Sequence, residues 1–136
     1  MRKINRIIVH CTATPAGRHV TVADIDRWHR QRGFAGIGYH YVIYLDGSVH
    51  EGRPVSCQGA HCSGYNATSI GVCYVGGVAA DCRTPLDTRT PAQRSSLVDL
   101  LRRLKTLYPG ATIHSHGDFA PKACPSFDAT AEYRSL

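Results

Sequence analysis

The sequence lacks any long hydrophobic run, and this absence excludes the commonest kind of membrane protein. No apolar stretch approaches the ~18 residues that a transmembrane helix needs. The start of the chain is charged, but Asn5 and Arg6 interrupt its apolar part, which falls short of the roughly 7–15 residues of a signal-peptide core. We therefore expect a soluble protein that is made in the cytoplasm without a signal peptide.

Acidic residues and lysine are also scarce. The sequence has ten Asp and Glu residues and 16 Lys and Arg residues, so the formal net charge is +6. Only three of the basic residues are Lys. The basic residues are scattered, with Arg102, Arg103 and Lys105 as the densest group, so a solvated helix face is favoured over a nucleic-acid site. The surplus charge would also attract the protein to a polyanionic surface such as a bacterial wall.

Internal repeats, linkers and a second domain are missing, so residues 1–136 are predicted to form one domain with its own core. The six Cys would allow disulfides, and Cys57 with Cys62 is close enough in sequence to pair under oxidising conditions. A cytoplasmic chain of this size more often keeps its thiols reduced. Cys11 and Cys73 lie in apolar runs and are expected in the core.

Hydrophobic periodicity and turn residues divide the chain into strands and helices. Strands are predicted over residues 4–10, 40–45, 48–52, 69–75 and 111–114, and loops over 12–17, 53–68 and 78–89. Helices are predicted over 22–32, from Thr90 to Tyr108, and from a capping Ser126 to about Ser135. Capping boxes begin the first two helices, at Thr21 with Asp24 and at Thr90 with Gln93. The order predicts an α/β fold with a central mixed sheet flanked by helices.

Candidate chemistry concentrates in the segment from His116 to Phe127, which follows the last predicted strand. Pro121 and Pro125 remove two backbone donors, so this segment is predicted to be a stiff loop and not a helix. It holds His116 and Cys124, an imidazole and a thiol, which are the two commonest kinds of zinc ligand.

A catalytic metal site needs a third ligand, and His10 can supply it from the end of the first predicted strand. Taken singly, His10 suits a packed strand-end residue and Cys124 a buried thiol, but functional sites of α/β proteins collect at strand ends. With His116 they make a set of two His and one Cys, which leaves a fourth position for water on zinc. The thiolate favours Zn²⁺ over magnesium or calcium.

Three further residues are candidates for catalysis or substrate binding. Lys122 lies two residues before Cys124, and its ammonium suits an oxyanion beside the metal, whereas the alternative is a solvated loop lysine. Tyr39 precedes a predicted strand and either brings a phenol hydroxyl to the site or simply packs. His61 lies in the predicted loop 53–68, and loops of that length are usually functional.

Several segments together resemble the zinc-dependent N-acetylmuramoyl-L-alanine amidases, which share a fold with the peptidoglycan recognition proteins. The segments are V-H-C-T-A-T (9–14), G-Y-H-Y-V-I-Y-L-D-G (38–47), H-C-S-G-Y-N-A-T-S-I-G-V-C-Y-V-G-G (61–77), T-P-A-Q (90–93) and A-P-K-A-C-P-S-F-D (120–128). The resemblance implies one zinc ion per chain. It also implies cleavage of the amide between the lactyl group of N-acetylmuramate and L-alanine in bacterial peptidoglycan.

The resemblance also assigns roles residue by residue. It implies that the zinc ligands are His10, His116 and Cys124. It implies that Tyr39 and Lys122 are the catalytic pair, and that His61 and Asn66 of the groove loop bind substrate. The resemblance implies a monomer that acts on the cell wall after release. Its partner would be peptidoglycan, and it would bind neither nucleic acid nor a membrane.

Two departures from the family and one alternative qualify these expectations. One phage member also inhibits its phage's RNA polymerase and has a longer segment before its first ligand, whereas only nine residues precede His10, which argues against polymerase binding. Gly117 stands where that relative has a second His, a change expected to spare the metal site and to alter the groove. Members of the fold that bind peptidoglycan without cutting it lack the Cys ligand, so Cys124 favours an enzyme over a binding module.

Overall fold

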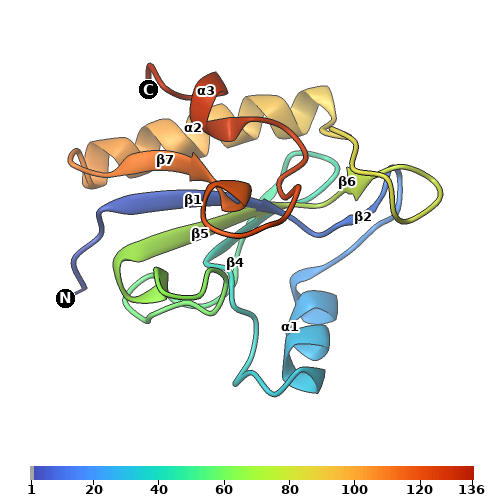
Figure 1. Cartoon of the computed structure of the whole chain (residues 1–136), viewed down its shortest axis with the longest axis horizontal. Helices are drawn as coiled ribbons and strands as arrows, with labels where there is room; N and C mark the ends of the chain where they lie inside the picture. The colour runs from blue at the N-terminus through green and yellow to red at the C-terminus, as the bar shows by residue number, and fades with distance from the viewer. Residues whose placement is uncertain (1) are drawn as a thin grey trace.

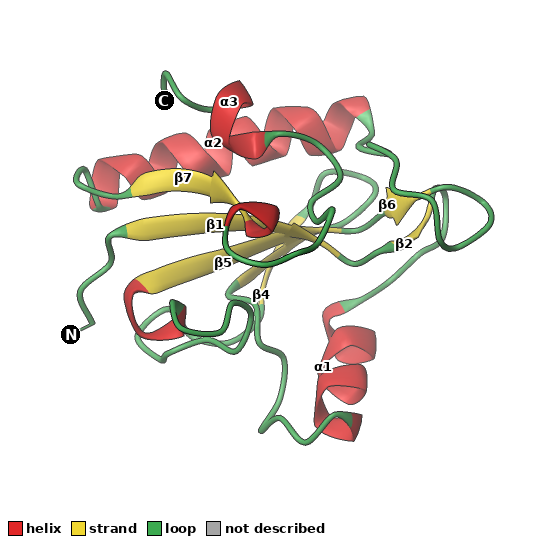
Figure 2. Cartoon of the chain, viewed as in Figure 1, coloured by secondary structure: helices red, strands yellow, loops and turns green. Residues whose placement is uncertain are grey.

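The computed structural model of the protein describes residues 2–136, and a five-stranded sheet forms its centre (Figure 1, Figure 2). Across the sheet the order is β4 (Val49–Glu51), β3 (Tyr41–Ile43), β5 (Ser69–Tyr74), β1 (Arg6–Cys11) and β7 (Thr112–Ser115). The pairs of β3 with β5, β5 with β1 and β1 with β7 are parallel, and β4 is antiparallel to β3. The sheet is mixed, as predicted.

Helices cover both faces of the sheet. Figure 1 shows α2 (Pro91–Leu107) and the short α3 (Ala129–Glu132) on one side and α1 (Val22–Gln31) on the other. Both predicted capping boxes are present. The side chains of Thr21 and Thr90 each accept a hydrogen bond from the backbone N–H three residues on, and their own backbone N–H groups donate to the side chains of Asp24 and Gln93. The first two helices therefore begin where the sequence predicts.

The larger core lies between α2 and the sheet. Four buried leucines of α2 form a stripe at helical spacing: Leu97, Leu100, Leu101 and Leu104. They belong to the same cluster as alternate residues of the two central strands: Ile7, Val9, Cys11, Ile70, Val72 and Tyr74. Because side chains alternate along a strand, His10 faces the opposite side of the sheet from this core.

Short pieces of regular structure occur in segments predicted as loops. β2 (Thr14–Pro15) pairs with β6 (Gly77–Val78) in a separate two-stranded sheet. The 3-10 helices η1 (Asn66–Thr68) and η2 (His116–Asp118) precede β5 and follow β7. Elements of two or three residues are too short to show a period, so the sequence pattern could not reveal them.

The prediction for the last helix was wrong at both ends. Asp128 caps α3, and the helix ends at Glu132, so Ser126 is not the cap and the helix does not reach Ser135. Ser126 has a φ of 71°, and its hydroxyl donates to the Gly77 carbonyl at 2.6 Å. Its side chain is therefore committed to a contact between loops, which the local sequence does not show.

The prediction for the buried face of α1 was only partly right. Helical spacing predicts one face with Val22, Ile25, Trp28 and His29; Ile25 and His29 are buried, but Trp28 is 37% exposed. A histidine on a helix would ordinarily lie at the surface or partly buried, whereas His29 is only 6% exposed.

Within residues 2–136, no helix is long and apolar enough to cross a membrane. All six cysteines are free, including Cys57, which is exposed, and Cys62, which is buried. Cys11 and Cys73 lie in the interior, as expected from their apolar surroundings in the sequence.

Arg89 ties α3 to the body of the protein. Its side chain is 1% exposed, and its guanidinium donates to both carboxylate oxygens of Asp87 and both of Glu132 at 2.7–2.9 Å. It also donates to the Tyr133 hydroxyl at 2.8 Å and stacks 3.4 Å above the Phe127 ring. The planar guanidinium of one arginine therefore hydrogen-bonds two carboxylates and stacks on an aromatic ring at the same time.

We predict that Arg89→Ala lowers the free energy of unfolding by about 3 kcal/mol, because it leaves two carboxylates without their partner. The expected loss lies at the low end for a buried pair, since Glu132 is 41% exposed and water can replace part of the contact. Urea denaturation measures it. Arg94→Ala is the control, because Arg94 is half exposed and makes one contact with Asp87, so it should cost at most about 1 kcal/mol. Equal losses in the two variants would contradict the assigned role of Arg89.

Candidate active site

Parallel pairing brings two histidines to the same edge of the sheet. In the register of β1 with β7, Val9 pairs with Ser115, so His10 and His116 follow at the same level. Both rings are buried, at 1% and 8% exposure, and their centroids lie 4.4 Å apart. The predicted meeting of these two strand ends is therefore present in the structure.

Cys124 reaches the two histidines on the loop that follows η2, which folds back along the end of β7. The Gly117 N–H donates to the Cys124 carbonyl at 2.8 Å, which closes the loop. The hydroxyl of buried Tyr74, at the end of β5, donates to the carbonyl of Pro125 at 2.6 Å. These two contacts fix the backbone that directly follows the Cys124 side chain.

The Cys124 sulfur also has a backbone donor. The Cys11 N–H, at the end of β1, lies 3.3 Å from Cys124 Sγ. Gly77 has a φ of 107°, and a Cβ at this position would overlap the Cys11 sulfur, so only glycine permits this close packing. The strand end thus positions the thiol as well as the first histidine.

The donor atoms of His10, His116 and Cys124 all lie within 4.8 Å of one another. Cys124 Sγ is 3.9 Å from His10 Nδ1. Ligands of one tetrahedral zinc ion lie roughly 3.3–3.6 Å apart when their bonds are about 2.0–2.3 Å long. The three side chains are therefore close to the spacing that one tetrahedral ion requires, and their chemistry suits such an ion.

Burial keeps the two imidazoles neutral. It lowers the pKa of His10 well below the ordinary value, and neighbouring imidazoles lower it further. The pKa of His116 is also lowered, first by burial and then by the charge of Lys122. A neutral imidazole keeps a lone pair, which is what a metal ion binds.

In the protein without metal, a hydrogen bond with Cys11 and burial both raise the pKa of the Cys124 thiol. A bound cation reverses this preference, because a coordinating thiol loses its proton. Metal binding at this site should therefore release a proton.

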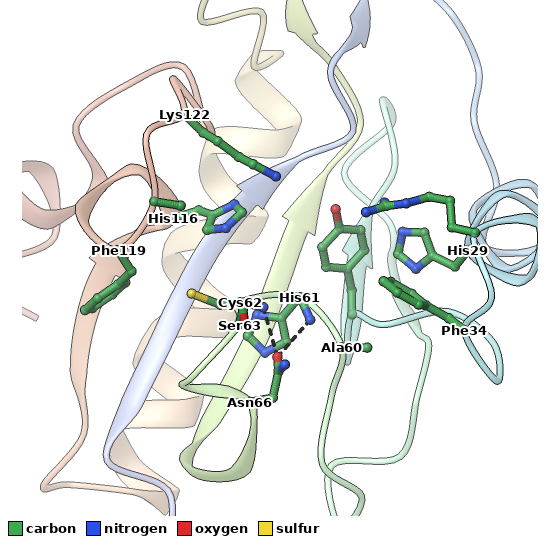
Figure 3. Close-up of a pocket in the computed structure, with 13 residues that line it drawn as sticks. His29, Phe34, Ala60, His61, Cys62, Ser63, Asn66, His116, Phe119 and Lys122 are labelled. Carbon is green, nitrogen blue, oxygen red and sulfur yellow. Dashed lines mark hydrogen bonds between the residues drawn. The ribbon is translucent and has the colours of Figure 1, made fainter.

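A cavity of about 450 Å³ opens beside the three donors (Figure 3). In Figure 3 His29 and Phe34 lie on one side of the cavity, and His116, Phe119 and Lys122 lie on the other. The two sides come from segments far apart in the sequence, the end of α1 and the loop after β7.

Both residues predicted to be catalytic line this cavity. Tyr39 is half-buried, and its ring lies 5.0 Å from the ring of His10. Burial raises the pKa of its hydroxyl well above the usual range, so the phenol keeps its proton and can donate it in a hydrogen bond. Lys122 is exposed at the rim of the same cavity.

His61 and Asn66, predicted to bind substrate, also line the cavity, but their polar atoms contact the protein. His61 Nδ1 lies 2.8 Å from His10 Nε2, and His61 Nε2 lies 3.3 Å from Ser69 Oγ. The Asn66 side-chain oxygen accepts from the N–H groups of His61 and Cys62 at 2.8 and 2.9 Å. Burial lowers the pKa of His61 to about 3, so its ring is neutral.

Sequence reasoning missed the residues at the end of α1. His29 Nδ1 accepts from the Gly38 N–H at 2.8 Å, and the ring lines the cavity. Arg32 and Phe34 also line it, with the Arg32 guanidinium 5.0 Å from the Phe34 ring. No local pattern marks these residues, because their place at the cavity depends on how α1 packs against the sheet.

Solved structures with the same architecture belong to one class of proteins that act on or bind peptidoglycan. The N-acetylmuramoyl-L-alanine amidase LysC from Clostridium intestinale superposes with a TM-score of 0.83 at 32% identity, covering 97% of this chain and 83% of that one. The Drosophila peptidoglycan recognition protein PGRP-LB superposes with a TM-score of 0.81 at 25% identity, covering 100% of this chain and 82% of that one.

Sequence comparison is more specific. The profile of the N-acetylmuramoyl-L-alanine amidase family matches residues 1–127. The endolysin of Klebsiella phage KP32 is 47% identical over 127 residues, which covers 93% of this chain and 83% of the relative. The endolysin of Escherichia phage T7 is 47% identical over 123 residues, covering 90% and 80%. The chain therefore belongs to the N-acetylmuramoyl-L-alanine amidase family, and the family, fold and amidase activity expected from the sequence are confirmed.

Gly117 generates a prediction about this site. A Cβ there would lie 2.5 Å from the Lys122 carbonyl oxygen and 3.2 Å from that of Cys124, so Gly117→Ala must displace the loop that carries both side chains. We expect wall lysis to fall about 10- to 100-fold, because small misplacements of reacting groups are costly. Turbidity clearing of purified cell walls measures the loss.

Gly110→Ala is the matched control, because a Cβ at Gly110 meets no heavy atom within 4 Å. It should clear walls at the parent rate. Parent activity in the Gly117 variant would show that the loop tolerates a side chain at this position.

Proposed function

We propose that the protein hydrolyses the amide between N-acetylmuramic acid and L-alanine with one zinc ion held by His10, His116 and Cys124. The observation that carries the proposal is the convergence of three donor atoms within 4.8 Å beside a cavity. Two neutral imidazoles and one thiolate give a net charge of +1 with Zn²⁺. They leave one position open, as catalytic zinc sites do and structural sites do not.

Bound zinc supplies a Lewis acid that activates water and polarises the amide carbonyl. The protein contributes the surroundings of that reaction. The Lys122 ammonium faces the cavity from a flexible stem and suits the negative charge that develops on the carbonyl oxygen. The Tyr39 phenol, which keeps its proton, is a neutral donor on the same side of the sheet as His10.

The substrate is a muropeptide of the bacterial wall. The cavity of about 450 Å³ is large enough to hold the part of such a chain around the scissile amide. His61 and Asn66 line it, and we expect the loop that carries them to face the bound substrate. The net charge of +6 favours association with an anionic wall. By analogy with the endolysin relatives, the enzyme acts there after release, as a monomer, since one chain supplies the whole site.

We predict that the purified protein holds about one zinc ion per chain and that Cys124→Ser removes both metal and wall lysis. A hydroxyl is a far weaker zinc ligand than a thiolate at neutral pH. The fold should survive, because the leucine core does not depend on the metal. Metal analysis after zinc-supplemented growth, circular dichroism and turbidity clearing measure the three quantities.

Cys57→Ser is the control for thiol removal, because Cys57 is exposed and belongs to no donor set among the described residues. It should keep parent zinc content and activity. A parent protein without zinc, or a fully active Cys124 variant, would exclude the proposed mechanism.

Lys122→Ala and Tyr39→Phe should separate catalysis from binding. If each donor acts on charge that exists only in the transition state, each substitution lowers kcat about 10²–10³-fold while zinc content and wall binding stay near the parent values. Lys3→Ala, at an exposed lysine, is the control. It should change the activation free energy of wall lysis by no more than about 0.5 kcal/mol.

The outcomes for these two residues are distinct. Equal losses of wall binding and rate in the Lys122 variant would indicate substrate recognition and not catalysis. A parent rate in Tyr39→Phe would show that the ring packs and that the hydroxyl has no role in the reaction.

A further inference from the structure

Behind the three donors, a chain of hydrogen bonds leads from the protein backbone to His10. We infer that His61 and Ser69 are positioning residues that hold His10 in the tautomer with its Nδ1 lone pair toward the metal position. The consequence for metal binding rests on the proposed zinc site, whereas the hydrogen-bond chain itself does not.

The chain has three links, and the side chains that form it are buried. Ser69 Oγ donates to the Tyr65 carbonyl at 2.7 Å. Ser69 Oγ also lies 3.3 Å from His61 Nε2, and His61 Nδ1 lies 2.8 Å from His10 Nε2. Ser69, His61 and His10 are 0%, 9% and 1% exposed, so water offers little competition for these bonds.

The backbone carbonyl at the far end sets the direction of every link. A carbonyl only accepts, so the single Ser69 hydroxyl hydrogen is committed to Tyr65 and the Ser69 oxygen must accept from His61 Nε2. A neutral imidazole with hydrogen on Nε2 has a bare Nδ1, so His61 accepts from the N–H of His10 Nε2. His10 Nδ1 is then bare, and it is the nitrogen that lies 3.9 Å from Cys124 Sγ.

The reverse direction would disable the site. If His61 donated from Nδ1, neutral His10 would carry its hydrogen on Nδ1, which faces Cys124, and no lone pair would point at the metal position. Histidine ligands of metals commonly donate their second N–H to an outer partner, and loss of such a partner costs about 10–100-fold in metal affinity.

The His61 ring packs closely between two glycines. A Cβ at Gly71 would lie 2.7 Å from a ring atom of His61, and a Cβ at Gly59 would lie equally close. The Asn66 side chain holds the His61 backbone N–H. Since both ring nitrogens already have partners in the protein, we assign His61 to orienting a ligand and not to direct contact with substrate.

The first test reads the tautomers and needs neither zinc nor activity. Ring nitrogen-15 NMR of the metal-free protein should show His10 and His61 both protonated at Nε2, and Ser69→Ala should give a mixture of tautomers at His61. Protonation of His61 at Nδ1 in the parent protein would overturn the inference. The result is independent of whether the proposed zinc chemistry is right.

The second test measures zinc affinity by competition with a chelator, in variants whose fold is checked by circular dichroism. His61→Leu should weaken zinc binding about 10–100-fold. His61→Asn, whose side-chain oxygen can take the place of Nδ1, should recover most of that loss. His114→Leu is the control, since His114 lies on β7, contacts Thr112 and Asp118, and should leave zinc affinity unchanged.

If the His61 variants fail to fold, Ser69→Ala tests the same inference. Loss of one neutral hydrogen bond predicts a change of about two- to tenfold in zinc affinity. Ser69 is buried and does not line the cavity, so a substrate contact cannot explain such a change. The inference would be overturned if Ser69→Ala and His61→Leu both bound zinc with the affinity of the parent protein while His61→Leu bound walls more weakly. That result would assign His61 to substrate recognition.

Discussion

The site depends on the parallel pairing of β1 with β7. Because the two strands run in the same direction, their carboxyl ends meet at one edge, and the side chains that follow come within reach of one ion. Antiparallel pairing would have put His10 and His116 at opposite edges. The leucine stripe of α2 stabilises this arrangement by covering the opposite face of the same strands, so the core and the site are two sides of one sheet.

Burial at this edge has two consequences that act together. It keeps the imidazoles of His10 and His116 neutral, which leaves each with a lone pair that a metal ion could bind, and it makes any unpaired nitrogen costly. The structure meets the second demand, because no buried side-chain nitrogen or oxygen within residues 2–136 lacks a hydrogen-bond partner. Buried donor groups therefore require an outer layer of polar contacts, and the contact of His61 with His10 belongs to that layer.

Local signals in the sequence were reliable where the structure is local. Both capping boxes depend on residues within four positions of each other, and each formed as predicted. Predictions failed where a distant contact decides. The candidate cap Ser126 is instead committed to Gly77, 49 residues away, and Glu132 at the end of α3 contacts Arg89, 43 residues before it. The exposure of Trp28 depends on how α1 packs, which periodicity alone does not reveal.

The sequence alone determined the kinds of candidate donor, the strand ends on which two of them lie, and the family, because residue chemistry and short motifs can be read along the chain. Only the tertiary structure decided which nitrogen of His10 faces Cys124 and which contacts His61. Those partners lie 114 and 51 residues away in sequence. Spacing along the chain carries no information about the direction of a side chain across such distances, since packing of separate segments determines it.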